Sequence, residues 1–320
     1  MVNQEMKNLK VVCLGGGIGT VNLIKGLKKY FNDITVIVST ADEGGSSGRL
    51  RRLYGVLPPG DLISCMAALS CTDIAKLLTY RFPGDRYGKD QNIGGQKLGN
   101  LIMTALDQIT GNPEKSVEFF KKLFKIQGTF IPVTNEPTTI SATTVQGYRI
   151  QGEEKIDLGK YKGIRVLDKV YVHPESVQAN KKALAAIENA DLLFFGPGDL
   201  FTTLLPVMIV SGVSDAIKAA KAKKFFIVNV ANKPFETRGY KTSDYVSTIA
   251  KHIGCFPFET IIVNNEFSVK IPKKYHYHYV KLDKKNPIAS VKVVSEALID
   301  KNFPLYHDSS KLAKAIVENI

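Results

Sequence analysis

The stretch KVVCLGGGIGTVNLIKGLKKYFNDITVIVS, residues 10–39, decides the fold. Residues 10–14 form a short apolar run, glycines follow at 15–19, and residues 21–30 carry apolar side chains at helical spacing. Residues 34–39 form a second, β-branched run. A strand, a glycine turn, a helix and a further strand make a βαβ unit, which implies a parallel sheet with a right-handed crossover.

The same alternation returns in the second half of the chain. Helical patterns are predicted at residues 179–189, 213–222 and 243–252, and strands at residues 192–195, 225–230 and 260–263. We therefore expect an α/β fold: a doubly wound, mostly parallel, Rossmann-like sheet with helices on both faces. The absence of a linker or repeat in the sequence favours one α/β domain over residues 1–320.

The middle of the chain follows a different pattern. Four helices are predicted there, at residues 61–69, 73–82, 98–110 and 113–124. A more polar pair of runs, residues 138–144 and 148–151, predicts a β-hairpin. Residues from about 60 to 175 are therefore expected to form a helical and antiparallel insertion within the parallel sheet.

Composition narrows the class of protein. The chain has 320 residues, of which 44% are hydrophobic and 23% are charged, as in soluble globular proteins. Lys+Arg 43 against Asp+Glu 30 gives 43 − 30 = +13, which attracts polyanions. Because no run of five like charges occurs, we expect any nucleic-acid binding to be incidental and favour a plain lysine-rich surface.

Cysteine usage and hydropathy point to a cytoplasmic protein. The four cysteines form no C-x-x-C pair, which fits reduced thiols. The first ten residues are polar, so no signal peptide is expected. The most apolar later stretch, residues 192–210, is interrupted by glycine, proline and aspartate, so we expect no membrane span.

The first candidate site is the glycine loop after the first strand. Backbone N–H groups of such a loop, at a helix N-terminus, can bind a phosphate. The dinucleotide pattern G-x-G-x-x-G is not met, because its last position is Thr20, and no Walker lysine follows. A nucleotide site and a tight turn therefore both remain open. The candidate phosphate-binding residues are Gly15, Gly16, Gly17, Gly19 and Thr20.

The second candidate lies beyond the second strand. Asp42 is placed where an acidic group can accept a ribose or sugar hydroxyl, or hold a metal. The residues after it offer free N–H groups, two hydroxyls and a guanidinium that can fork onto phosphate oxygens. We favour a binding loop over a solvated surface loop. Its candidate residues are Gly44, Gly45, Ser46, Ser47 and Arg49.

Further polar residues follow other strands or open helices. Asp61 stands in the first turn of a predicted helix, where it is either a cap or a carboxylate aimed into a cleft. Asn100 follows glycines at another helix entry, and Gly198 and Asn229 lie at the ends of two strands. Loops that converge on one edge of a sheet are what a binding cleft requires.

Taken together, these motifs resemble one known family, the gluconeogenesis-factor family, also described as YvcK/CofD-like. The resemblance covers roughly residues 10–265, and its most specific part is the string D-x-G-G-S-S-G-R-L-R that begins at Asp42. It implies a Rossmann-like fold. Other matching strings include Pro58-Pro59-Gly60-Asp61, Leu98-Gly99-Asn100, Gly196-Pro197-Gly198, Thr202-Thr203-Leu204-Leu205-Pro206 and Val263-Asn264-Asn265.

The resemblance implies one of two functions, because the family has two branches. One branch transfers a phospho-lactyl-type group from a guanosine diphosphate donor with a metal. The other binds nucleotide sugars such as UDP-sugars and influences carbon metabolism, cell-wall synthesis and cell shape. The string at Gly196–Thr203, and Pro59-Gly60-Asp61 in place of the transferases' S-P-D-x-D-T, are typical of the regulatory branch.

Four positions depart from the pattern usual in the regulatory branch. Arg-Asn is replaced by Ile63 and Ser64, a histidine by Gln96, and the arginine of a C-terminal R-H-D by Tyr306. That arginine would be a natural phosphate partner, so the identity of the nucleotide sugar is left open.

Two hypotheses follow. In the first, a nucleoside diphosphate sugar places its diphosphate on the two glycine loops, and Asp42, Asn229 and Asn265 contact sugar, ribose or base. In the second, the protein is a 2-phospho-L-lactate-transferase-like enzyme, with Asp42 and Asp61 holding a divalent cation such as Mg²⁺. The sequence assigns no catalytic residue and leaves open whether the chain forms a homo-oligomer.

Overall fold

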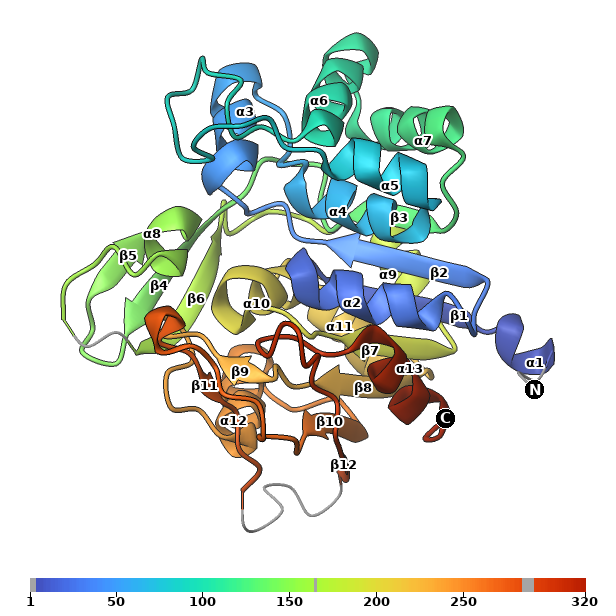
Figure 1. Cartoon of the computed structure of the whole chain (residues 1–320), viewed down its shortest axis with the longest axis vertical. Helices are drawn as coiled ribbons and strands as arrows, with labels where there is room; N and C mark the ends of the chain where they lie inside the picture. Colours follow the sequence, from blue (N-terminus) through green and yellow to red (C-terminus); the bar gives the residue numbers. More distant parts are fainter. Residues whose placement is uncertain (1–3, 164–165, 284–290) are drawn as a thin grey trace.

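The fold is built on a seven-stranded, wholly parallel sheet with strand order β12-β10-β8-β7-β1-β2-β3. A computed structural model describes residues 4–163, 166–283 and 291–320. Figure 1 shows the sheet crossing the molecule. Its strands are β1 (Lys10–Gly15), β2 (Asp33–Val38), β3 (Thr129–Pro132), β7 (Leu192–Phe195), β8 (Lys223–Ile227), β10 (Thr260–Asn264) and β12 (Lys292–Glu296).

The order of the strands reverses between β1 and β7. From β1 the chain builds outward through β2 to β3, and it then returns to β7 and builds the other half through β8, β10 and β12. The connections on the two sides of this point leave the sheet in opposite directions, so a crevice forms outside the carboxyl ends of β1 and β7. This is the doubly wound, Rossmann-like topology that the sequence predicts.

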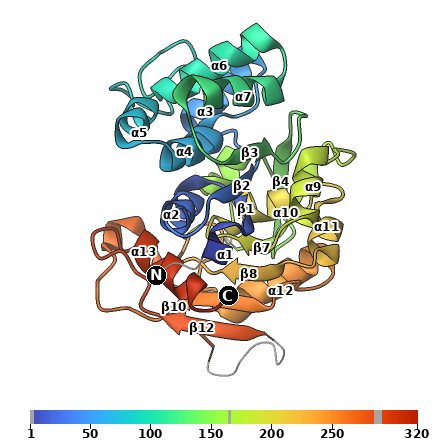
Figure 2. The same cartoon turned by 90° about the vertical axis from the view of Figure 1, so that its right-hand side faces the viewer.

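Alternating side chains of the strands supply two hydrophobic cores. Val11 and Cys13 of β1 face one core, whereas Val12 and Leu14 face the other. Figure 2 shows the helices that cover the two faces. The first face carries α1 (Gln4–Lys7), α2 (Gly17–Leu27), α4 (Gly60–Leu69), α5 (Thr72–Thr79), α6 (Leu98–Thr110), α7 (Pro113–Phe124) and α13 (Ser309–Val317). The second carries α9 (Lys181–Glu188), the π-helix η1 (Leu200–Leu204), α10 (Leu205–Met208), α11 (Val213–Ala219) and α12 (Thr242–Ile253).

The predicted insertion needs a correction in its middle. The four predicted helices are α4 to α7, and two of them, α6 and α7, have the predicted bounds. However, β3 lies between them and the hairpin, and it pairs with β2 as the seventh strand of the central sheet. The range 60–175 therefore contains one core strand. Prediction missed it because the four residues of β3 are too few to show a period.

An antiparallel sheet follows β3, as the hairpin pattern predicts. It consists of β4 (Thr139–Thr144), β5 (Arg149–Gln151) and β6 (Leu167–His173), with α8 (Glu153–Asp157) between β5 and β6. In the C-terminal half of the chain, β9 (Ala231–Asn232) pairs with β11 (His278–Tyr279). The 3₁₀ turn η2 (Lys273–Tyr275) precedes β11.

The prediction missed several short helices, and the one that matters for the site is α3. The glycine-serine stretch after Asp42 is not a loop but the first turn of α3 (Gly45–Tyr54), with Gly44 at its N-cap. In the same way, the glycine loop after β1 contains the start of α2, which begins at Gly17. Glycines lower helix propensity, so a sequence pattern places these helix starts too late.

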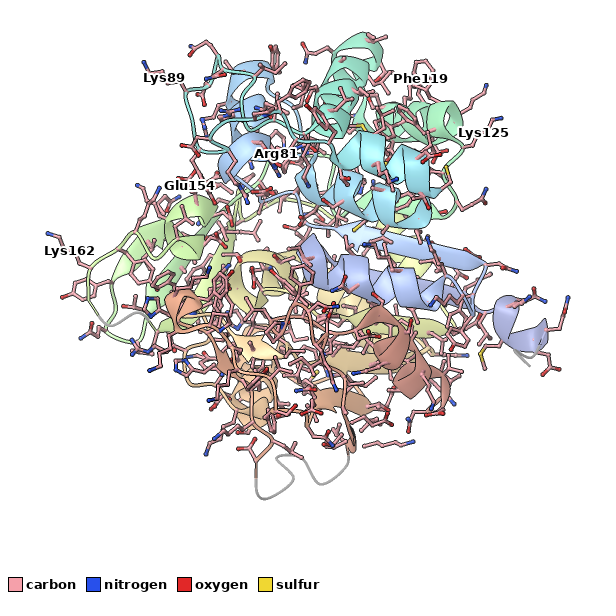
Figure 3. All side chains as sticks on the ribbon, in the orientation of Figure 1. Arg81, Lys89, Phe119, Lys125, Glu154 and Lys162 are labelled. Atoms are coloured by element: carbon pink, nitrogen blue, oxygen red, sulfur yellow. The ribbon has the colours of Figure 1, made fainter. Side chains whose placement is uncertain are left out.

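The packing of the central strands predicts a large stability difference between two phenylalanines. Phe194 of β7 is fully buried and stacks on Phe225, with ring centroids 5.1 Å apart. We expect Phe194→Ala to lower the free energy of unfolding by about 3–5 kcal/mol, measured by urea denaturation. Phe119→Ala on α7, where the side chain is 46% exposed (Figure 3), should cost less than about 1 kcal/mol. Equal losses would contradict this description of the core.

Candidate functional site

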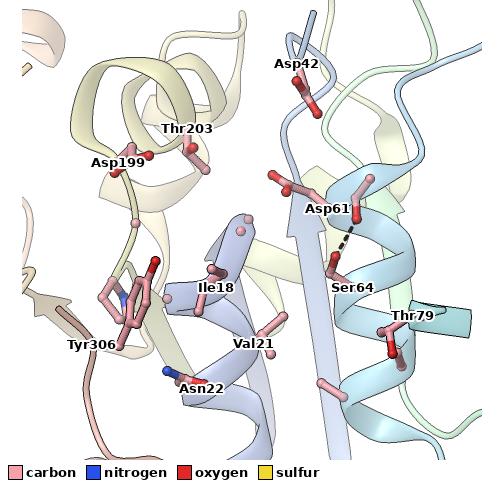
Figure 4. A pocket seen from close by; sticks show the side chains of 18 of the residues that line it. Ile18, Val21, Asn22, Asp42, Asp61, Ser64, Thr79, Asp199, Thr203 and Tyr306 are labelled. Atoms are coloured by element: carbon pink, nitrogen blue, oxygen red, sulfur yellow. Dashed lines mark hydrogen bonds between the residues drawn. The ribbon is translucent and has the colours of Figure 1, made fainter. Parts of the chain in front are cut away.

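A cleft of about 1170 Å³ opens where the order of the strands reverses. It lies at the carboxyl ends of β1, β2, β7 and β8, as expected for a ligand site of a doubly wound sheet. Figure 4 shows part of it, with α2 and α4 side by side along the cleft. The predicted site residues that line it are Gly16, Gly17, Gly19, Asp42, Gly44, Ser46, Ser47, Asp61, Asn100, Gly198 and Asn229.

The glycine loop after β1 holds a carboxylate of the protein itself. A Cβ atom on Gly16 would lie 2.0 Å from Oδ2 of Asp61, so only glycine allows Asp61 to approach this closely. The backbone N–H of Gly17 donates to the Asp61 carboxylate. The positive end of the α2 dipole therefore faces Asp61. Asp61 is thus aimed into the cleft, rather than serving only as a cap of α4.

The other residues of this loop fix its position. Gly19 lets the first turn of α2 approach the carbonyl of Pro197, which a Cβ atom would meet at 2.4 Å. The Thr20 hydroxyl donates to the same carbonyl over 3.4 Å. Thr20 is buried, and neither it nor Gly15 lines the cleft. These contacts join the ends of β1 and β7, so Gly15 and Thr20 shape the loop instead of facing the cleft.

The first turn of α3 supplies the opposite wall. Asp42 Oδ1 accepts a hydrogen bond of 2.9 Å from the backbone N–H of Gly44. Ser46 and Ser47 also line the cleft, whereas Gly45 is covered by the guanidinium of Arg86. This turn brings the Ser47 hydroxyl next to the Asp42 carboxylate, which gives the centre of the cleft a set of oxygen ligands.

Burial perturbs the carboxyl groups of this centre. Burial and the nearby Asp61 charge raise the pKa of Asp42 to about 7. Burial also raises the pKa of Asp61, against the opposing effects of Lys97 and the Gly17 N–H. Glu153 of α8 lines the same region, and burial together with the charge of Asp42 raises its pKa well above the usual range. Near neutral pH, this group of carboxyls therefore binds either protons or a cation.

The carboxylate and hydroxyl oxygens of this centre fit a hard divalent cation. Asp42 and Asp61 would hold it, with the hydroxyl of Ser47 beside Asp42. Such a cation would compensate both the burial and the Asp61 charge that raise the pKa of Asp42. The chemistry it would supply is charge compensation for phosphate oxygens.

A second cluster of carboxylates surrounds a lysine side chain. Oxygens of Asp157, Asp199 and Glu236 lie within 4.8 Å of one another. The Nζ of Lys233 pairs with Asp199 at 2.7 Å, with Glu236 at 2.9 Å and also with Asp157. Burial lowers the pKa of Lys233, but the three carboxylates outweigh it and raise that pKa well above its usual value. Because the ammonium is bound to all three carboxylates, we do not assign a metal to this group.

The three predicted asparagines occupy different environments. Asn229 Oδ1 accepts a hydrogen bond of 2.9 Å from the N–H of Gly198, which fixes the loop after β7. Asn100 is fully buried and lines the cleft, yet neither its amide oxygen nor its amide nitrogen has a partner among the described residues. Asn265 does not line the cleft, and its Nδ2 donates to the carbonyl of Ser295. The structure thus separates Asn265 from the other two.

The contacts of Arg49 do not support the predicted phosphate role. Its side chain is 1% exposed and does not line the cleft. The guanidinium donates to four backbone carbonyls, and the two shortest bonds, 2.8 and 2.9 Å, reach Gly94 and Asn92. Arg49 therefore fixes the loop of residues 82–96 to α3. The sequence could not show this, because the accepting carbonyls lie 36–45 residues further along the chain.

Sequence reasoning also missed the cations of the cleft. Lys97, which precedes α6, donates to the Ser64 hydroxyl over 2.8 Å, and burial lowers its pKa. Arg81 donates to the Ser46 hydroxyl and to the carbonyl of Gly95. Arg81 points inward, whereas Lys89 lies on the outer edge of the same loop (Figure 3). A signal existed for Lys97, which belongs to the glycine-rich stretch before Asn100.

The four departures from the family pattern have different surroundings. Ile63 is buried in the core, whereas Ser64 lines the cleft. Gln96 is buried beside Arg49, and its amide oxygen, turned toward the guanidinium, accepts from Nε at 3.2 Å. Tyr306 lines the cleft near Ile18 (Figure 4). Ser64 and Tyr306 are therefore the two departures that alter the cleft surface.

The fold and the cleft together define a class: a Rossmann-like α/β protein with a polar ligand cleft at the switch point of its sheet. Residues 11–299 match the family described as 2-phospho-L-lactate transferase CofD. The chain belongs to this CofD family, whose relatives include proteins named gluconeogenesis factor.

Two such relatives and one solved structure show the extent of the similarity. The chain is 34% identical to the gluconeogenesis factor of Bacillus subtilis, with 97% of each chain covered. It is 36% identical to that of Listeria monocytogenes, over 83% of this chain and 79% of the relative. A crystal structure of a UPF0052-family protein from Bacillus halodurans superposes with a TM-score of 0.87 at 31% identity, covering 98% of this chain and all of the other.

Within residues 4–163, 166–283 and 291–320, no helix is both long and apolar enough to cross a bilayer.

The contacts of Arg49 predict a structural effect of its removal. In Arg49→Ala, the backbone carbonyls around residues 85–94 lose a charged donor, and we expect a loss of roughly 2–4 kcal/mol in unfolding free energy, measured in urea. Arg52→Ala is the matched control, because Arg52 forms an exposed pair with Asp90 that should contribute less than about 1 kcal/mol. The assignment fails if the two variants are equally stable.

The raised pKa of Asp42 predicts a pH-dependent loss of stability. The carboxyl is easier to protonate when folded, so its contribution is full below its unfolded pKa of about 4 and is lost as the pH rises through about 7. Asp42→Asn should therefore be more stable than the wild type at about pH 8, and this advantage should shrink toward about pH 4. Urea unfolding of both proteins across this range measures it. Parallel stability curves would show that Asp42 is not perturbed.

Proposed function

We propose that the protein binds a nucleoside diphosphate sugar, such as a UDP-sugar, in the cleft at the switch point and acts as a regulatory protein of carbon metabolism, cell-wall synthesis and cell shape. The observation that carries the proposal is the cleft itself, whose volume of about 1170 Å³ accommodates a ligand larger than a single nucleoside. Relatives named gluconeogenesis factor support the regulatory role.

The lining of the cleft supports this class of ligand. The diphosphate would lie near Ser46, Ser47 and the cations Arg81 and Lys97, where hydroxyl and charged donors converge. The unpaired amide of Asn100 offers one donor and one acceptor to the sugar or base. Because Asp61 already accepts the N–H of Gly17, that N–H is occupied, and the diphosphate would be held mainly by the donors on the opposite wall of the cleft.

A second candidate function rests on the carboxylate pair. Asp42 and Asp61 are placed to hold a divalent cation, and the chain matches the 2-phospho-L-lactate transferase family over residues 11–299. A metal-dependent transferase that uses a nucleoside diphosphate donor is therefore the alternative. In that case Asp42 and Asp61 would hold Mg²⁺ beside the donor phosphates.

A ligand panel separates the two functions. Calorimetry with nucleoside diphosphate sugars, with and without magnesium, should show binding in both conditions and no product after long incubation if the protein is a regulator. Metal-dependent binding with release of a nucleoside monophosphate would instead establish the transferase. The absence of heat with every nucleoside diphosphate sugar at millimolar concentration would contradict the proposed ligand.

Asn100 provides a sharp test of the cleft. Its amide has no internal partner, so Asn100→Ala should leave the free energy of unfolding unchanged or raise it. The same substitution should weaken nucleotide-sugar binding about tenfold, because the ligand loses a hydrogen-bonding group. Asn265→Ala is the control, since Asn265 lies outside the cleft and should keep full affinity. Equal affinities for the two variants would place the ligand away from Asn100.

A further inference from the structure

The cleft continues well beyond the carboxylate centre as a slot along the outer face of α2, with α4 on one side and the start of α13 on the other. One face of α2 lines it from end to end, through Ile18, Asn22, Lys25 and the residues that follow. Val21 on α2 and Ser64 on α4 border the slot in Figure 4. The eleven residue steps from Gly17 to Lys28, at about 1.5 Å each, make it roughly 16 Å long.

The walls of the slot are small side chains, and its far end is cationic. Ala67 and Ala68 line it on the α4 side, and Ser70 lies just beyond them. Four exposed lysines line its far end, and we call them the lysine arm: Lys25, Lys28 and Lys29 from the end of α2, and Lys76 from α5. Thr72 and Thr79 add hydroxyls. Because these side chains are small, they leave room for a ligand beside α2.

Within the part of the chain that the structure describes, the acidic groups of the cleft lie away from the lysine arm. All five carboxylates that line the cleft lie toward its other end: Asp42, Asp61, Glu153, Asp157 and Asp199. Lys28 donates to the carbonyl of Ala68 over 2.7 Å, and Lys29 to the hydroxyl of Ser310 over 2.9 Å. Among the described residues, no lysine of the arm forms an ion pair. Burial and the charges of Lys25 and Lys29 lower the pKa of Lys28, which shows that like charges meet here.

We propose that the lysine arm binds a small phosphorylated anion with at least two negative charges. This subsite is separate from the one that would hold the diphosphate of the nucleoside diphosphate sugar. Clustered ammonium groups with neighbouring hydroxyls suit phosphate, because each lysine acts as a point charge. The distance of roughly 16 Å from the start of α2 places this anion outside the reach of the groups around Asp61. The inference goes beyond the proposed function, because it requires no nucleotide.

A purely structural role for these lysines makes a different prediction. Lysines in the last turn of a helix stabilise its dipole, and Lys25 and Lys76 both occupy such positions. That role affects only the stability of the protein. It does not account for the convergence of four lysines from two helices on one slot, and it predicts no affinity for phosphate.

The test uses inorganic pyrophosphate and inorganic triphosphate as probes, with binding measured by calorimetry. Lys25→Gln/Lys76→Gln removes two ammonium groups for which no hydrogen bond or ion pair is found among the described residues. Lys115→Gln/Lys122→Gln removes the same charge from exposed positions on α7, outside the cleft. We expect the first variant to bind both probes at least about tenfold more weakly than the control variant.

Three outcomes would overturn the proposal. These are equal weakening in the two variants, a lower melting temperature of the first variant without loss of probe binding, and citrate binding as tight as that of the phosphates. Complete competition between pyrophosphate and a nucleoside diphosphate sugar would also overturn it, because the two would then share one subsite. Affinity for the nucleotide sugar should not change in Lys25→Gln/Lys76→Gln. Binding of the nucleotide sugar thus tests the proposed function, and binding of the two phosphate probes tests the lysine arm.

Discussion

The reversal of strand order between β1 and β7 is the constraint on which the rest of the structure depends. At that point the chain leaves the sheet in opposite directions on its two sides, so no connection can cover the carboxyl ends of the two strands. Polar loops can converge there without a cost to the core, which is complete on both faces of the sheet. The cleft is therefore a product of topology, and its chemistry is a product of the residues that border it.

Burial of charge decides what that chemistry can be. Asp61 faces the positive end of α2, and Asp42 accepts a hydrogen bond from the N–H of Gly44. Lys97 donates a hydrogen bond to a serine hydroxyl. Each group has a partner, yet the carboxyls remain harder to ionise than in water. A ligand or cation that compensates the charge of these carboxylates therefore gains binding free energy, because it relieves an unfavourable interaction of the folded protein. Asn100, buried without a partner, adds to the same effect.

The sequence predicts the sheet well, because hydrophobic period and glycine turns are local signals. The bounds of β7 agree residue for residue, β1 differs by one residue at its end, and β2 is displaced by one residue at each end. Arg49 shows where such reasoning stops. A guanidinium beside serines and glycines has the composition of a phosphate site, but its partners are carbonyls of a distant loop. The distinction depends on tertiary contacts, as does the capture of Asp61 by the glycines after β1.

The ion-pair group around Lys233 has a consequence for how related sequences can diverge. One ammonium pairs with carboxylates from three parts of the chain: α8, the loop after β7, and Glu236, which also accepts the N–H groups of Phe201 and Thr202. Replacing the lysine alone would leave three acidic groups together with no counter-charge. We therefore expect the four positions to be under joint selection. In a family tree, they should change in the same lineages, and the lysine should be lost only where acidic partners are lost with it.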